Sequence, residues 1–277
     1  MARISTVLII FFISCGLCYS QNSDVVRIQE VYKEIDTVKL SMDVIHSAEL
    51  DKSKKYPGIV FFFGGGWNGG SIKQFIPHGE YLAKKGMVCF LVDYRVKSRQ
   101  GTTPFESLKD AKSAVRFIRK NAERFNLDPT RLVASGGSAG GHLAAATAMT
   151  TSHSEDTDDM SISCVPQALV LFNPVIDNGP AGYGHDRIQE AYPSFSPLHN
   201  IKKGVPPTIV FLGTNDRLIP VETMKYFQKS IERVGGRCDL HLYEGAGHGF
   251  FNYGRGQYYE LTVAAMDQFL ATLDYFQ

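Results

Sequence analysis

The sequence predicts an α/β fold with a mostly parallel sheet of about eight strands, flanked by helices. From Pro57 onward, continuous apolar runs recur along the chain, and each is followed by glycines or an acidic residue and then by a helical stretch. Strands buried on both faces have such runs, and helical stretches between them imply right-handed crossovers in a parallel sheet. The length of 277 residues and the hydrophobic content of 44% are sufficient for a sizeable buried core.

Two kinds of apolar pattern predict the strands. Segments 25–35 and 38–47 alternate apolar and polar residues, which predicts two half-exposed strands that form an antiparallel edge. The later runs are continuous and predict buried strands. They are GIVFFF (58–63), MVCFLVDY (87–94), RLVASG (131–136), QALVLFNPVI (167–176), TIVFLG (208–213) and CDLHLY (238–243).

Helices are predicted between and after these strands. Segment 103–125 has apolar residues at helical spacing and a proline near its start. Segment 220–236 has the same spacing and ends on glycines, as helices often do. An alanine-rich helix follows Ser138, and an amphipathic helix over 258–276 closes the chain.

The first twenty residues are typical of a secretory signal peptide. Arg3 precedes a short apolar run, and small residues precede an expected cut between Ser20 and Gln21. A membrane anchor is the alternative, but the run is shorter than the ~20 residues that a span needs. Lipid attachment at Cys15 is a second alternative. We therefore expect residues 1–20 to be a signal peptide of a secreted or periplasmic protein, and 21–277 to be a single domain.

Charge and cysteine content exclude several classes of protein. The formal net charge is +1, so nothing indicates nucleic acid or an anionic membrane as the partner. Three cysteines remain after the predicted cut, which excludes the disulfide framework of small secreted domains. Cys89 is expected in the core, and Cys164 with Cys238 is the one pair to consider.

Two segments interrupt the alternation of strands and helices. Segment 152–164 is acidic and polar, and we expect a solvated loop. Segment 178–204 is rich in glycine, proline and aromatic residues and lies between two predicted strands. We expect this second segment, called the cap segment below, to cover a pocket.

A nucleophile motif joins a predicted strand to the alanine-rich helix. Gly136, Ser138 and Gly140 form G-x-S-x-G at this junction. In a sharp strand-to-helix turn the serine takes a strained backbone angle, and residues two positions away must be small. The motif alone is weak, but its position makes Ser138 the candidate nucleophile.

A serine hydroxyl needs an imidazole to take its proton. His248 lies on a glycine-flanked loop just past the last predicted strand, where this topology requires the histidine. The other histidines have structural interpretations. We expect His46 and His241 in strands, His78 and His153 on helix and loop surfaces, His142 packed in its helix, and His185 and His199 in the cap segment.

The acid that orients the histidine is expected on a loop at the same end of the sheet. Asp216 follows the next-to-last predicted strand and gives the chain order Ser, Asp, His. Asp177 is the competitor, with an interpretation as a loop cap, and Glu244 is a more remote one. We favour Asp216.

Six stretches in order carry a family resemblance: VFFFGGGWNGGS, VDYRV, DAKSAVRFIRKNAERFNLDPTRL, ASGGSAGGHLAAA, FLGTNDRLIP and YEGAGHGFF. Together they resemble the α/β-hydrolase esterases of the hormone-sensitive-lipase-like type, near acetyl-xylan and feruloyl esterases. The likeness runs from about Val31 to the C-terminus. It implies an α/β-hydrolase fold, a triad of Ser138, Asp216 and His248, ester hydrolysis through an acyl-enzyme, and no metal or organic cofactor.

The resemblance also assigns the oxyanion donors, with one departure. The family motif is usually His-Gly-Gly-Gly, whereas Phe63 stands here before three glycines. By position, the donors are the backbone N–H groups of Gly65, Gly66 and Ala139. Losing a bracing hydrogen bond costs about 0.5–1.5 kcal/mol, whereas losing an oxyanion donor raises the barrier by about 2.7–4 kcal/mol. We therefore expect altered bracing and an intact site.

The stretch VDYRV contains charges for which we expect structural roles. Asp93 stands at a strand end, and we expect a charge pair between Asp93 and Arg95. Asp110 and Arg116 on the following helix are expected to brace that helix.

The expected function is that of an exported serine esterase that removes a short acyl group, acetyl in the first place, from carbohydrate. Trp67, Tyr183 and Tyr192 are expected to stack on sugar, and His185 to line the pocket. The expected partner is a small ester or an acylated oligo- or polysaccharide, without nucleic acid or stable membrane insertion. Alternatives are a general carboxylesterase, a feruloyl esterase, a serine peptidase and a non-catalytic binding protein.

Overall fold

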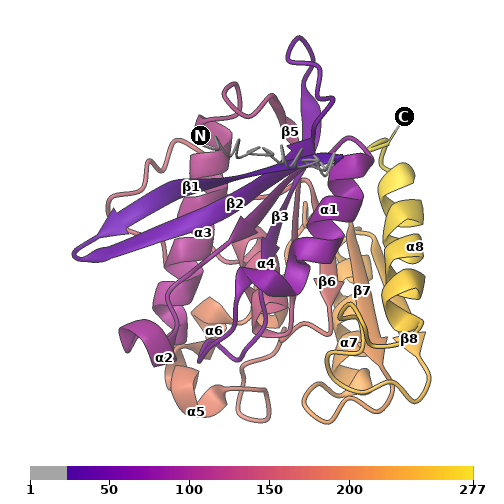
Figure 1. Ribbon diagram of the computed structural model, residues 1–277. Helices are drawn as coiled ribbons and strands as arrows, with labels where there is room; N and C mark the ends of the chain where they lie inside the picture. Colours follow the sequence, from indigo (N-terminus) through magenta and orange to yellow (C-terminus); the bar gives the residue numbers. More distant parts are fainter. Residues whose placement is uncertain (1–23, 277) are drawn as a thin grey trace, which may run out of the picture.

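The computed structural model describes residues 24–276, which form one eight-stranded sheet in the order β1-β2-β4-β3-β5-β6-β7-β8 (Figure 1). β1 pairs antiparallel with β2, and β2 antiparallel with β4; all other pairs are parallel. The predicted α/β class and antiparallel edge are confirmed. The strands are β1 Val25–Ile35, β2 Val38–Ser47, β3 Tyr56–Phe62, β4 Val88–Val92, β5 Leu127–Gly137, β6 Ala168–Phe172, β7 Thr208–Gly213 and β8 Cys238–Tyr243.

Helices cover both faces of the sheet (Figure 1). On one face, residues of α3, α4 and α7 share a core cluster that includes Leu108, Leu143 and Phe227. On the other face, α1 and α8 contribute Leu82 and Met266 to a second cluster. The long helices are α1 Ile76–Lys84, α3 Pro104–Lys120, α4 Ala139–Met149, α7 Val221–Arg233 and α8 Tyr258–Ala271; the short ones are η1 Ile72–Phe75, α2 Lys97–Gln100, α5 His185–Ile188, η2 Gln189–Ala191, α6 Tyr192–Phe195 and η3 Pro197–Asn200.

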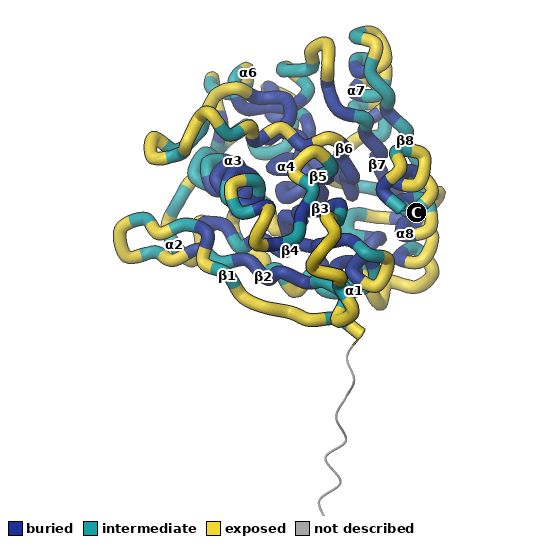
Figure 2. The backbone as a smooth tube through the Cα atoms, turned by 90° about the horizontal axis from the view of Figure 1, so that it is seen from above, coloured by how far each residue is buried: buried dark blue, intermediate teal, exposed yellow. Residues whose placement is uncertain are grey.

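Burial is concentrated in the central strands, as Figure 2 shows in dark blue. Every residue of β4, β6 and β7 is buried, as their continuous apolar runs predict. The edge strand β1 alternates and leaves side chains such as Val31 exposed. None of the helices within residues 24–276 is long and apolar enough to cross a membrane. The predicted signal peptide lies outside the described residues.

The start of α3 shows why this helix begins where it does. Thr103 accepts a hydrogen bond from the N–H of Phe105, and Glu106 accepts one from the N–H of Thr103, which together form a capping box. Pro104 occupies the first turn, where no N–H partner is needed. The helix ends at Lys120, five residues before the predicted end at Phe125.

The expected ion pair between Asp93 and Arg95 is wrong. Asp93 instead binds the guanidinium of Arg99 through both carboxylate oxygens, over 2.6 and 2.8 Å. Arg95 binds Asp110 in the same bidentate way, over 2.7 and 2.8 Å, and both of these side chains are buried. Asp93 and Arg95 both lie beyond the end of β4, and each charge meets a partner from another element, Arg99 of α2 or Asp110 of α3.

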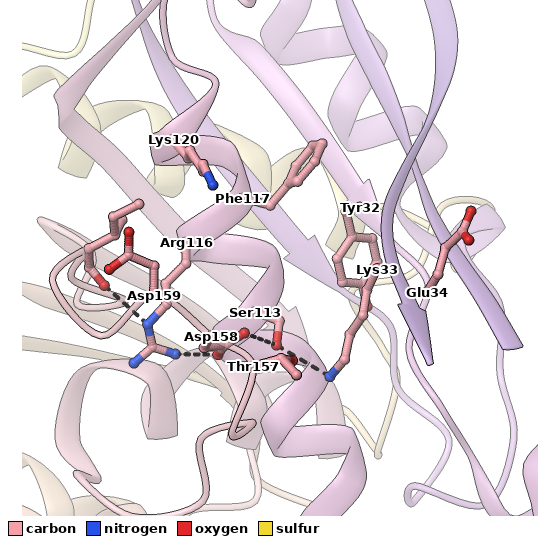
Figure 3. Close-up of a pocket in the computed structure, with 11 residues that line it drawn as sticks. Tyr32, Lys33, Glu34, Ser113, Arg116, Phe117, Lys120, Thr157, Asp158 and Asp159 are labelled. Carbon is pink, nitrogen blue, oxygen red and sulfur yellow. Dashed lines mark hydrogen bonds and ion pairs between the residues drawn. The ribbon is translucent and has the colours of Figure 1, made fainter. Parts of the chain in front are cut away.

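The expected solvated loop at 152–164 is confirmed in part, since residues such as Asp156 and Asp159 are exposed, but two of its acidic side chains bind cations. Glu155 accepts hydrogen bonds from Lys33 of β1 and from Arg95, over 2.7 and 2.9 Å. Asp158 binds the buried guanidinium of Arg116 over 2.7 Å, and Figure 3 shows this contact beside a pocket of about 280 Å³. Ionised side chains are rarely buried without a partner, so the acidic residues of this loop match buried cations of α3 and β1.

His78 also differs from its prediction, because its side chain is fully buried and does not lie on a helix surface. The ring packs among aromatic side chains that include Phe75 and Tyr259, at centroid distances of 5.1 and 4.8 Å. Neither ring nitrogen has a hydrogen-bond partner in the described residues. Burial lowers the pKa of His78 to about 3, so the ring is neutral in the folded protein.

All three described cysteines are buried and free. Cys89 lies in β4 within the core, as predicted. Cys164 and Cys238 do not pair: Sγ of Cys164 donates to the carbonyl of Thr147 in α4 over 3.5 Å, and Cys238 begins the edge strand β8.

Candidate active site

Ser138 lies on a sharp turn between β5 and α4. Its backbone has φ 54° and ψ −119°, a conformation that a non-glycine residue rarely adopts. A Cβ on Gly136 would come within 2.4 Å of the backbone of Gly140, and a Cβ on Gly140 within 2.0 Å of the carbonyl oxygen of Phe62. Both flanking positions therefore require glycine, and the strained turn leaves the serine side chain partly exposed at the end of the strand.

The structure joins Ser138, His248 and Asp216 in a chain of hydrogen bonds. Nε2 of His248 lies 2.9 Å from Oγ of Ser138, and Nδ1 lies 2.7 Å from Oδ2 of Asp216. Because a carboxylate only accepts, Nδ1 carries the proton and Nε2 presents its lone pair to the serine hydroxyl. Oδ1 of Asp216 accepts from the N–H groups of Leu218 and Ile219, over 2.8 and 3.0 Å. These two bonds fix the orientation of the carboxylate.

These three residues follow three different strands of the parallel sheet. Ser138 comes directly after β5, Asp216 shortly after β7, and His248 after β8. The carboxyl ends of parallel strands lie along one edge of the sheet, which is the lower edge in Figure 1. The side chain of Asp216 is fully buried, whereas 24% of the His248 side chain is exposed. The imidazole is thus reachable from solvent while its acid partner is shielded.

The competing acids lie elsewhere. Asp177 accepts a hydrogen bond from the N–H of Gly179 over 2.8 Å and lies 3.9 Å from the ring of His199, which fits its interpretation as a loop cap. Glu244 contributes its backbone carbonyl, to which the hydroxyl of Tyr258 donates over 3.5 Å. In the described part of the chain, neither carboxylate contacts the imidazole beside the serine.

Two other histidines have packing roles. His142 is fully buried one turn after the nucleophile, and its ring stacks on that of Phe195 with the centroids 4.3 Å apart. Its Nε2 lies 3.2 Å from the backbone carbonyl oxygen of Phe195. His153 places Nε2 3.1 Å from the hydroxyl of Ser194. Burial lowers the pKa of both rings, to about 3 for His142.

The glycine-rich segment 63–70, called the oxyanion loop below, has an unusual backbone. Gly65 and Gly66 have φ of 133° and 62°, and Trp67 has φ 56°. The N–H of Gly64 donates to Oε1 of Gln74 over 2.6 Å. Within residues 24–276, the N–H groups of Gly65 and Gly66 donate to no protein acceptor. Two backbone donors therefore remain available to a ligand.

Ala139 offers a third backbone donor. It is the first residue of α4, where an N–H group has no acceptor within the helix. The partial positive charge at a helix N-terminus also favours a negative charge nearby. A Cβ on Gly64 would lie 3.4 Å from Cβ of Ser138, so the oxyanion loop passes directly beside the nucleophile.

Phe63 stands where the family motif has histidine, and packing holds it. Its ring is 1% exposed and stacks on Tyr94, with centroids 4.1 Å apart and planes at 13°. The hydroxyl of Tyr94 donates to the backbone carbonyl of Phe63 over 2.6 Å. Burial raises the pKa of Tyr94, which keeps the hydroxyl protonated as a donor. A stacked ring pair and this hydrogen bond thus hold the start of the oxyanion loop.

Amide side chains connect the oxyanion loop to the loop of His248. Nε2 of Gln74 donates to Oδ1 of Asn252 over 2.9 Å, and Nδ2 of Asn252 donates to the carbonyl of Gly249 over 2.8 Å. The N–H of Gly249 donates to Oδ1 of the fully buried Asn173 over 3.0 Å. Nδ2 of Asn173 lies 3.4 Å from Nε2 of His248. The position of the histidine therefore depends on Asn252 of its own loop and on Gln74 and Asn173 from two other segments.

Gln74, Asn173 and Asn252 were not among the site residues predicted from the sequence. Asn173 stands at the end of a predicted strand, at the edge where site residues gather, and this position is a usable signal. Gln74 and Asn252 are 178 residues apart, and no spacing in the sequence indicates that they meet.

The predicted sugar-stacking residues differ in their environment. Trp67 is 1% exposed and packs against His142, Tyr183 and Phe195, so its ring has no free face. This burial contradicts the expectation that Trp67 stacks on sugar, and the ring instead anchors the oxyanion loop in the core.

The predicted cap residues are partly exposed. His185 places Nδ1 3.1 Å from the carbonyl of Asn178, and its ring lies 5.9 Å from that of Tyr192. A pocket of about 310 Å³ opens between the cap segment, the oxyanion loop and residues 101–104. Within residues 24–276, no three His, Cys, Asp or Glu side chains gather as a metal site requires.

Comparisons with known proteins agree with this geometry. The BD-FAE family matches residues 42–231. The structure of Thermogutta terrifontis esterase 2 phosphoramylated by tabun is 41% identical and superposes with a TM-score of 0.87, covering 90% of this chain and 96% of that one. Structures of the same esterase with propionate and with butyrate bound are 40% identical and cover 90% of this chain and 95% of those chains, each with a TM-score of 0.85.

Two curated relatives are more distant. Esterase LipC of Mycobacterium tuberculosis is 28% identical over 220 residues, which cover 72% of this chain and 54% of LipC. An acetylxylan esterase of Xylanibacter ruminicola is 28% identical over 187 residues, which cover 62% of this chain and 36% of that enzyme. The chain thus spans about half the length of the first relative and about a third of the second. By the family match, the fold and the likeness to these esterases, the chain belongs to the BD-FAE family of α/β-hydrolases, in the hormone-sensitive-lipase-like and acetyl-xylan esterase group.

Proposed function

We propose that the protein hydrolyses carboxylic esters with Ser138 as nucleophile, His248 as general base and acid, and Asp216 as the residue that orients the imidazole. The observation that carries this proposal is the chain of two hydrogen bonds, of 2.9 and 2.7 Å, that connects the three side chains. A nucleophile beside a base, with the base oriented by a third group, is the arrangement that activates a serine hydroxyl.

The reaction has two halves. Oγ of Ser138 attacks the ester carbonyl carbon while its proton moves to Nε2 of His248, which gives a tetrahedral oxyanion and an imidazolium. The bond to the alcohol oxygen then breaks, and the imidazolium gives its proton to the leaving alcohol, which leaves an acyl-serine. Water attacks this acyl group in the same way and releases the carboxylic acid and free Ser138. Asp216 stays ionised and stabilises the imidazolium in each half.

Three backbone N–H groups are proposed to bind the oxyanion. Gly65 and Gly66 have no other acceptor in the described residues, and Ala139 lies at the N-terminus of α4. Donors that are already in place stabilise the charge as it develops, and one such donor is worth about 2.7–4 kcal/mol of barrier. A Cβ on Gly65 would lie 2.2 Å from the carbonyl oxygen of Gly69, and one on Gly66 would lie 2.9 Å from the hydroxyl of Tyr183, so neither position has room for a side chain.

We propose a short acyl group as the substrate's acid part, with acetyl on carbohydrate as the first choice. Support comes from the relative named as an acetylxylan esterase and from the related esterase crystallised with propionate and butyrate. The near-neutral net charge suits a neutral glycan. The proposed location is secreted or periplasmic, on the basis of the N-terminal sequence.

A substrate panel tests the proposal. Purified protein is given acetylated xylan and acetylated oligosaccharides, together with p-nitrophenyl esters of acetate, butyrate and longer acids and a methyl ferulate arm. Acetate release from the glycans with a preference for short acyl groups is the expected result. Cleavage of the p-nitrophenyl esters without acetate release from the glycans would indicate a general carboxylesterase. A preference for methyl ferulate would indicate a feruloyl esterase.

The Ser138→Ala variant separates catalysis from simple binding. It is expected to lose esterase activity while it keeps the wild-type thermal midpoint. A folded Ser138→Ala variant with full activity would contradict the assignment of the nucleophile.

A further inference from the structure

The side chain of Arg187 reaches from the cap segment to the oxyanion loop. Its Nη1 donates a hydrogen bond to the backbone carbonyl of Gly66 over 2.5 Å. Its guanidinium also lies over the indole of Trp67, 5.2 Å from the ring centroid. The geometry points to Arg187 as a positioning residue that holds the oxyanion loop in its working shape, an inference that rests on the function proposed above.

The carbonyl of Gly66 is the link between the oxyanion loop and the cap. The carbonyl of Gly65 is bonded inside the loop, by the N–H of Asn68 over 3.0 Å. The carbonyl of Trp67 accepts from the N–H of Lys97 over 3.0 Å, which ties the later part of the loop to α2. Among the described residues, only Arg187 donates a hydrogen bond to the loop from the cap segment.

A glycine pair needs such an anchor if its N–H groups are to point in one direction. Gly65 and Gly66 rotate more freely than other residues, because they lack a Cβ. Oxyanion stabilisation depends on donors that are held in place before the reaction. Tyr94 and Gln74 fix the loop before the glycine pair, and a guanidinium on the Gly66 carbonyl fixes the peptide after it. A hydrogen bond from a charged donor is stronger than a neutral one.

Trp67 gives a second reason for an anchor at this point. It is a bulky residue with φ 56°, in the left-handed region that such residues rarely occupy. A conformation of this kind persists only where the surrounding structure holds it. Arg187 contacts Trp67 in two ways: it donates to the carbonyl of the preceding residue, Gly66, and its guanidinium lies over the indole ring.

The cap segment in turn holds Arg187. The guanidinium lies 5.3 Å from the ring centroid of Tyr183, whose carbonyl accepts a hydrogen bond from Nδ2 of Asn178 over 2.9 Å. The hydroxyl of Tyr183 lies 2.9 Å from the place that a Cβ on Gly66 would occupy. The adjacent Asp186 is 3.7 Å away and its side chain is 82% exposed, so it competes weakly for the guanidinium. The cap thus contacts the oxyanion loop directly, in addition to lining the pocket with Asp186 and Arg187.

Steady-state kinetics on p-nitrophenyl acetate test this role. Arg187→Met keeps most of the apolar stem and removes the hydrogen bond and the charge, and we expect kcat to fall about tenfold or more with KM within about threefold. Arg187→Lys keeps the charge and a donor but loses the planar stack, so an intermediate kcat is expected. Lys203→Met removes one exposed charge from the same cap segment and is the matched control, with kcat expected at the wild-type value.

A transition-state analogue gives a readout that a merely structural role would not change. The inhibition constant of a trifluoromethyl ketone, which forms an oxyanion on the serine, should rise in proportion to the loss in kcat, while the KM for p-nitrophenyl acetate stays within about threefold. A further arm uses Arg187→Ala with added guanidinium, which should recover part of the lost kcat. A kcat and analogue affinity within twofold of wild type in folded Arg187→Met would overturn the inference. The proposed function fails separately, through an active Ser138→Ala variant.

Discussion

Nε2 of Gln74 donates a hydrogen bond to Oδ1 of Asn252 over 2.9 Å, and this contact joins the oxyanion loop to the loop that carries His248. Oε1 of the same Gln74 side chain accepts from the N–H of Gly64 over 2.6 Å. One amide therefore sets the position of the proposed oxyanion donors relative to the proposed base. The relation explains how the site can keep its geometry although Phe63 replaces the motif histidine.

Gln74→Leu is expected to lower kcat about tenfold and stability by about 1–3 kcal/mol, because the N–H of Gly64 loses its acceptor. Kinetics with p-nitrophenyl acetate and urea denaturation measure the two effects. Gln167→Leu is a matched control, since Oε1 of Gln167 accepts from the N–H of Leu132 over 3.2 Å, five residues before the end of β5 and apart from the oxyanion loop. The control should lose stability and keep kcat.

A double-mutant cycle of Gln74→Leu and Asn252→Ala tests whether the two loops are coupled. Residues in one hydrogen-bond network show coupling energies of about 0.5–3 kcal/mol. We expect a value in this range for the kcat effects. Strictly additive losses would show that each residue acts on its own loop only.

Asp216→Asn is expected to lower kcat about 10⁴-fold, because an amide in place of the carboxylate favours the wrong imidazole tautomer. Asp177→Asn is the control at the competing acid, and it should leave kcat within about twofold of wild type, since Asp177 bonds Gly179 within its own loop. The two kcat values decide between the acids. Equal losses in both variants would refute the choice of Asp216.

Gly140→Ala is expected to cost about 3 kcal/mol or more, because the new methyl group would overlap the carbonyl oxygens of Phe62 and Phe63 at 2.0 and 2.3 Å. Those oxygens belong to the backbone and move little. Gly247→Ala serves as the comparison, since a Cβ there meets only a backbone oxygen of Asn215 at 4.0 Å. Thermal and urea unfolding of both variants measure the difference, and similar losses would contradict the steric account.

His78 predicts an acid-dependent loss of stability. Burial lowers its pKa from the model-peptide value of 6.5 to about 3, so the folded protein binds this proton less readily than the unfolded chain does. The contribution is fully present above pH 6.5 and is lost as the pH falls from 6.5 toward 3, by about 1 kcal/mol per pH unit.

The variant His78→Leu tests this effect, because it removes the titrating group and leaves an apolar side chain in an aromatic surrounding. Urea unfolding of wild type and variant between pH 5 and 8 is the measurement. The free energy of unfolding should depend less on pH below 6.5 in the variant. Parallel curves would show that His78 has no such role.

The residue pattern predicts the strands, four of the five long helices and the turn at Ser138, whereas α1 at Ile76–Lys84 was not predicted. Buried strands such as 208–213 have continuous apolar runs because both faces are covered, and this property is local. The turn is local too, since Gly136 and Gly140 are needed within two residues of Ser138. The predicted positions of Asp216 and His248 followed from the order of the strands, because strand ends at one edge of a parallel sheet must meet.

Which side chains meet across the fold depends on the packing of distant elements and could not be predicted from the sequence. Arg95 binds Asp110 and not the nearby Asp93, and Arg187 reaches Gly66 across 121 residues. Such contacts depend on the angle and the position at which each helix and loop packs against the sheet. These quantities arise from the fit of many side chains together, so no single spacing in the chain contains them.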